Sequence, residues 1–144
     1  MSALPSAGAT PVPAVTFQAV DVPDEFAESA AEIWAEQAPA VAEALWPYVR
    51  EPRAITVELH HTDGFRTRTE GWIRDWGVGV ATSDWIAIDV ARVDAVGHTL
   101  AHLLMHELAP CLLRQGLRGV HAVPSWFHPG VAPHVPGAWE VRLP

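Results

Sequence analysis

Three stretches of the chain have the composition or the apolar–polar alternation of β-strands. VTFQAV at residues 15–20 and AITVELHH at residues 54–61 each carry an apolar side chain at every second position. GVGVATSDWIAIDV at residues 77–90 has the composition of two strands joined by a turn near Ser83 and Asp84. The pattern therefore predicts four strands in the first 90 residues.

The longest helical pattern lies between the first two predicted strands. Residues 25–46 combine several alanines with larger apolar side chains, so that one face of a helix would be apolar. Asp21 and Asp24 are suitable N-caps, and Pro39 is expected to interrupt the helix.

A second helix is predicted to follow Asp94, which would act as its N-cap. Its interior is rich in leucine and alanine, so we expect it to be buried on most sides. Pro110 is expected to end or kink this helix, because proline lacks the N–H donor that a helix interior needs. A short helix to Leu117, another at about residues 124–134 and a strand at residues 139–143 would complete the fold.

Length and composition indicate a single domain. The chain has 144 residues, of which 49% are hydrophobic, and this suits one compact core. Residues 1–14 are small and rich in proline, and we interpret them as a flexible leader. Residues 15–144 are predicted to form one α+β domain.

Charge and cysteine content exclude several classes of function. The formal net charge of −8 argues against nucleic acid or an anionic membrane as a partner. Cys111 is the single cysteine, so no intramolecular disulfide is expected. No apolar run is long enough for a membrane span, and the N-terminus lacks the pattern of a signal peptide. We therefore expect a cytoplasmic protein.

The most informative motif is HTLAHLLMHELAP at residues 98–110. His98, His102 and His106 recur at every fourth residue, so on a helix they would form a nearly straight row. Zinc peptidases of the zincin type place His-Glu-x-x-His on such a row. Two imidazoles bind Zn²⁺, and the Glu deprotonates the zinc-bound water.

None of the three windows of this motif is complete. The window beginning at the first histidine has Thr99 in the position of the Glu, and the next has Leu103 there. The third window has Glu107 in the correct position, but Pro110 replaces its second histidine.

A further motif, VPSWFHPGVAPHV at residues 123–135, gives the chain a resemblance to the peptidase MA-like, or gluzincin, domain. In that family the equivalent stretch typically reads Pro-x-Trp-aromatic or aliphatic-x-Glu-Gly-x-Ala, and its Glu is the third zinc ligand. Here Pro129 takes the place of that Glu. The resemblance implies a minimal zincin fold, with a small mixed sheet packed on a long N-terminal helix and a His-bearing central helix. The residues that match the frame are Pro124, Trp126, Phe127, Gly130 and Ala132.

Two registers of the ancestral motif remain open. His106 lies 23 residues before Pro129, a spacing that suits the family, and in this register His106 and Glu107 persist. His102 lies 27 residues before Pro129, and in that register both histidines persist while Leu103 replaces the base. We favour the first register as the ancestral one, with Glu107 as the candidate catalytic residue.

A rearranged zinc site is the alternative to a lost one. His102 and His106 form the better residual metal pair, with His98 as an alternative ligand. His128 and His134 flank the lost Glu position, and either would complete a three-histidine ligand set.

Other notable side chains have simpler interpretations. His60 and His61 are expected to form a solvated strand end. Cys111 is expected to be a small buried apolar residue rather than a nucleophile.

The sequence thus supports a catalytically inactive pseudo-peptidase that binds a protein or peptide partner in the former substrate cleft. The alternative is a divergent zinc-dependent hydrolase with a histidine-rich site. A structural subunit of a larger assembly is the third hypothesis. Zinc is the expected cofactor only under the hydrolase hypothesis.

Overall fold

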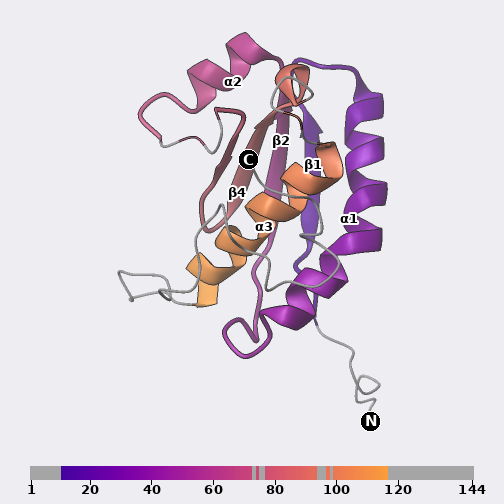
Figure 1. Cartoon of the computed structure of the whole chain (residues 1–144), viewed down its shortest axis with the longest axis vertical. Coiled ribbons are helices and arrows are strands. Elements are labelled where there is room, and N and C mark those ends of the chain that lie inside the picture. Colours follow the sequence, from indigo (N-terminus) through magenta and orange to yellow (C-terminus); the bar gives the residue numbers. More distant parts are fainter. Residues whose placement is uncertain (1–10, 73, 75–76, 94–96, 98, 117–144) are drawn as a thin grey trace.

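The computed structural model describes residues 11–72, 74, 77–93, 97 and 99–116, and it has an α+β fold (Figure 1). Two long helices and one short helix accompany a mixed four-stranded sheet. The elements are β1 (Val15–Ala19), α1 (Asp24–Ala44), β2 (Ile55–His60), α2 (Thr62–Arg68), β3 (Gly79–Ala81), β4 (Trp85–Asp89), the 3₁₀ helix η1 (Val90–Arg92) and α3 (Leu100–Gly116).

The four strands predicted in the first 90 residues are present, and their order in the sheet is β1-β2-β4-β3. β1, β2 and β4 are parallel to one another, whereas β3 pairs with β4 in the antiparallel sense. Because the three parallel strands run in the same direction, their last residues lie at the same end of the sheet. These residues are Ala19, His60 and Asp89. The predicted turn between β3 and β4 is also confirmed.

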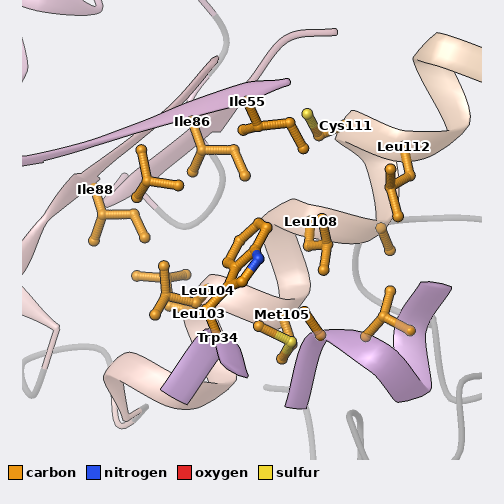
Figure 2. Close-up of a cluster of buried hydrophobic side chains, with 14 of the residues drawn as sticks. Trp34, Ile55, Ile86, Ile88, Leu103, Leu104, Met105, Leu108, Cys111 and Leu112 are labelled. Atoms are coloured by element: carbon orange, nitrogen blue, oxygen red, sulfur yellow. The ribbon is translucent and has the colours of Figure 1, made fainter. Parts of the chain in front are cut away.

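The large hydrophobic core lies between one face of the sheet and the helices α1 and α3 (Figure 2). Alternate residues of β2 and β4 point into it, as the alternation predicts, and Trp34 of α1 inserts between the sheet and α3. The labelled side chains in the figure come from all these elements: Trp34, Ile55, Ile86, Ile88, Leu103, Leu104, Met105, Leu108, Cys111 and Leu112. Burial of these apolar surfaces is the main stabilising contribution to the fold.

The opposite face of the sheet is covered in part by α2, a helix that the sequence pattern does not predict. α2 has seven residues and one buried side chain, Phe65, which packs with Val80, Ala87 and the partly buried Trp85. A helix this short has no detectable amphipathic period, and the segment's threonines, arginines and glycines are typical of a loop. Its helical state therefore depends on tertiary contacts.

The start and middle of α1 differ from the prediction. The N-cap position is Pro23, and no side chain caps the helix. Asp24 is its first helical residue, while Asp21 Oδ1 instead accepts a hydrogen bond from the backbone N–H of His61, at 2.7 Å. Pro39 lies inside the helix without ending it, because packing of the neighbouring buried residues outweighs one missing backbone hydrogen bond.

No helix among the described residues is long and apolar enough to cross a membrane. The predicted helix at residues 124–134 and strand at residues 139–143 lie outside the described residues, as does most of the predicted leader at residues 1–14.

Candidate functional site

The histidine-bearing helix begins later than the sequence pattern suggests. Thr99 is its N-cap: the Thr99 hydroxyl accepts a hydrogen bond from the His102 N–H at 3.0 Å, and the Thr99 carbonyl accepts one from Leu103 at 3.0 Å. Asp94, the predicted N-cap, lies outside the described residues. Within α3 the row consists of His102 and His106, and His98 lies outside the described residues.

Pro110 does not end the helix. α3 continues through it to Gly116, and every residue from 102 to 113 is buried. Proline removes the N–H that would bond to the carbonyl of His106 and costs about 3 kcal/mol in a helix interior. Burial of the surrounding leucines on α1 and the sheet offsets that cost. The position that would carry the second zinc ligand thus stays on the helix but offers no donor atom.

The two helical histidines do not converge on a common point. His102 is 3% exposed and His106 is fully buried. Their ring centres are 6.5 Å apart, and the ring planes are inclined by 28° in a stacked arrangement. Two imidazoles on a tetrahedral Zn²⁺, with Zn–N bonds of about 2.1 Å, place their ring centres about 5 Å apart, and a linear pair about 6.4 Å apart. The pair as it stands does not fit a shared zinc ion.

Glu107 is enclosed between α3 and the edge strand β3. Its side chain is fully buried, and it lies directly against the backbone of Gly79. A methyl group added to Gly79 would meet the Glu107 carboxylate, with the Cδ atom at 3.0 Å and the Cγ atom at 3.3 Å. A general base must reach a water molecule at hydrogen-bond distance. Glu107 instead fills the space that a glycine in β3 leaves open.

The remaining candidate ligands are not brought together by the described structure. No group of three His, Cys, Asp or Glu side chains that would hold a metal ion occurs in the described part of the chain. His128 and His134, like Pro129, lie outside the described residues.

Cys111 is a buried side chain in the core, as predicted. Burial raises the pKa of its thiol to about 12. A nucleophilic cysteine needs a lowered pKa, so Cys111 is inert at neutral pH.

The expectation that His60 is solvated is wrong. His60 is only 3% exposed, and its Nε2 lies 3.0 Å from Glu58 Oε1. Since an ionised carboxylate only accepts, Nε2 carries the hydrogen. His61 is exposed and occupies the N-cap position of α2.

His60 belongs to a polar cluster that sequence reasoning missed. Arg68, Asp21 and Asp89 surround the His60–Glu58 pair where the parallel strands end. Alternation along β2 places Glu58 and His60 together on the face opposite the main core, and this alternation is visible in the sequence. What the pattern does not show is that α2 covers that face.

No protein-family model, characterised protein or solved structure matches this chain.

Proposed function

We propose that this protein is a gluzincin-like pseudo-peptidase, a peptidase MA-like scaffold that has lost hydrolysis and serves as a binding or assembly module. Its partner would be a protein or peptide bound in the former substrate cleft. The observation that carries the proposal is the burial of Glu107 against Gly79, which removes the candidate base from water.

Three features of α3 support the loss of catalysis. Hydrolysis on zinc requires three protein ligands and a base beside the metal-bound water. Pro110 supplies no ligand in the position that the family's second histidine occupies. His102 and His106 have ring centres too far apart for one zinc ion. Glu107 is fully buried against Gly79.

The register that begins at His106 receives support from the core. Leu103, the base position of the other register, is fully buried among apolar side chains (Figure 2). Glu107, by contrast, lies beside β3. We therefore propose that the ancestral motif occupied residues 106–110.

Metal content is the first experiment. We expect purified, tag-free protein to retain no zinc after a chelator wash and to cleave no member of a generic peptide library. Near-stoichiometric zinc that resists washing would contradict the proposal and favour the divergent hydrolase. In that case His102→Ala and His106→Ala should each abolish both zinc retention and activity, and His128→Ala and His134→Ala would identify the third ligand.

A repair experiment tests the family resemblance separately. Pro110→His restores a ligand and a backbone donor in a helix that is already continuous, so Pro110→His with Pro129→Glu is expected to bind zinc. The matched pair Leu103→Glu with Pro129→Glu is expected to unfold, because it places a carboxylate in the apolar core. If the Pro110→His/Pro129→Glu variant folds and takes up no zinc, the result counts against the gluzincin assignment.

The proposal includes a cytoplasmic location, which the lone reduced Cys111 suits. Cell fractionation tests it, and recovery from the extracellular medium would contradict it.

A further inference from the structure

Helix α2 is attached to the sheet mainly by polar and charged contacts. Arg68 donates two hydrogen bonds to the Glu58 carboxylate, from Nε to Oε1 at 2.8 Å and from Nη2 to Oε2 at 3.0 Å. The same guanidinium stacks on the ring of Trp85, with its carbon 3.8 Å from the ring centre. This bidentate arrangement ties the end of α2 to both β2 and β4.

The beginning of α2 is tied to the same edge of the sheet. The Thr62 hydroxyl donates to Asp89 Oδ1 at 3.1 Å, and the His61 N–H donates to Asp21 Oδ1 at 2.7 Å. His60 lies between these contacts, with its Nδ1 at 3.9 Å from Asp21 Oδ1, beyond hydrogen-bond distance. α2 is thus held by residues at or just beyond the carboxyl ends of all three parallel strands.

Apolar anchoring of α2 comes from a single buried side chain. Phe65 is its one buried residue. A seven-residue helix is too short to persist without tertiary contacts. Two buried atoms beneath it, His60 Nδ1 and Asp89 Oδ2, have no hydrogen-bond partner among the described residues. Opening of α2 would expose both atoms to water, and each could then form a hydrogen bond that it lacks in the closed state.

We propose that α2 is an acid-released flap, closed by the Arg68–Glu58 pair and opened when Glu58 is protonated. Opening uncovers the small apolar surface formed by Val80, Trp85 and Ala87 on the second face of the sheet. This device is independent of the state of the former peptidase site, which lies on α3 at the other face.

The charges around Glu58 determine the direction of the switch. Arg68 faces it from α2 and His60 from its own strand, while its register neighbours are uncharged, Gln18 on β1 and Ala87 on β4. Asp21 and Asp89 face His60 and Thr62 rather than Glu58.

Burial raises the pKa of Glu58, but the hydrogen bonds from Arg68 and His60 outweigh it and hold that pKa below its ordinary value of 4.5. A carboxylate whose pKa is lowered in the closed state stabilises that state at pH values above its ordinary pKa. This stabilisation is lost as the pH falls through the lowered pKa. The flap is therefore closed at neutral pH and opens in acid.

Amide hydrogen exchange tests the proposal on the intact chain. The N–H groups of Phe65 and Thr69 donate within α2, to His61 and Phe65 carbonyls, and report its opening. The N–H of Leu103 at the start of α3 is the reference for the rest of the fold. Protection factors, which correct for the intrinsic effect of pH, are compared at pH 7 and below pH 4.

We expect Glu58→Gln to lower the protection of Phe65 and Thr69 at least tenfold at pH 7, with Leu103 unchanged. Glu70→Gln, an exposed glutamate just after α2, is the matched control and should change neither. The unmodified protein should show the same selective loss below pH 4, which keeps the test valid if the variant does not fold. Unchanged protection of α2, or an equal fall at Leu103, would overturn the proposal.

Discussion

A double-mutant cycle can test whether the Glu107 side chain packs against Gly79. Gly79→Ala adds one methyl group in β3, directed at the Glu107 carboxylate, with the Cδ atom only 3.0 Å from the new carbon. Glu107→Ala removes that carboxylate. The two changes therefore oppose each other in one small volume of the interior.

The expected magnitudes follow from this geometry. Overpacking a filled interior costs about 1–3 kcal/mol, so Gly79→Ala alone should lower the free energy of unfolding by about that amount. In the Glu107→Ala background the methyl group has room, and replacing glycine in a strand gains about 0.5–1 kcal/mol. The coupling energy between the two positions is thus expected to be about 1.5–4 kcal/mol.

Urea denaturation followed by tryptophan fluorescence measures the four free energies of unfolding, since the chain has seven tryptophans. If Gly79→Ala lowers the free energy of unfolding equally with and without Glu107, the added methyl group and the Glu107 side chain do not share this space. Glu107 would then be accessible for another role, and the main support for a pseudo-peptidase would fall.

Three further predictions concern other parts of the fold. Gly116→Ala should destabilise the protein by about 1–3 kcal/mol despite the higher helix propensity of alanine, because the new Cβ would meet the Tyr48 carbonyl; a rise in the urea midpoint would contradict this contact. Cys111 should react with a thiol reagent at pH 8 no faster than the protein unfolds, given its raised pKa of about 12; rapid labelling of the native protein would refute its burial. In Glu58→Gln the free energy of unfolding should fall less steeply as the pH is lowered. The unmodified protein loses the contribution of ionised Glu58 as the pH falls through its depressed pKa, and the variant lacks that contribution at every pH. If the two proteins lose the same free energy between pH 5 and pH 3, Glu58 does not contribute.

The strands and the two long helices could be predicted because their signals are local. In β2, Ile55, Val57 and Leu59 alternate with polar residues, and the main core receives those three side chains. The pattern specifies which face of an element is apolar, and the hydrophobic effect then buries that face. The α+β class follows from such patterns alone.

The state of the candidate site depended on tertiary structure. Pro110 predicts a helix end from its own chemistry, yet α3 continues because its neighbours are buried on two other elements. The fully buried Glu107 packs against Gly79 in β3, which is far from it in the sequence. His60 has the local pattern of an exposed strand end, and α2 covers it.

Local sequence therefore determined the strands and the two long helices. Long-range packing determined that α2 forms and what each functional side chain contacts. The periodic pattern of a strand or helix indicates which face a side chain points from, but not which residues it meets on that face. That occupant comes from another part of the chain, and its presence is decided by the free energy of the whole fold.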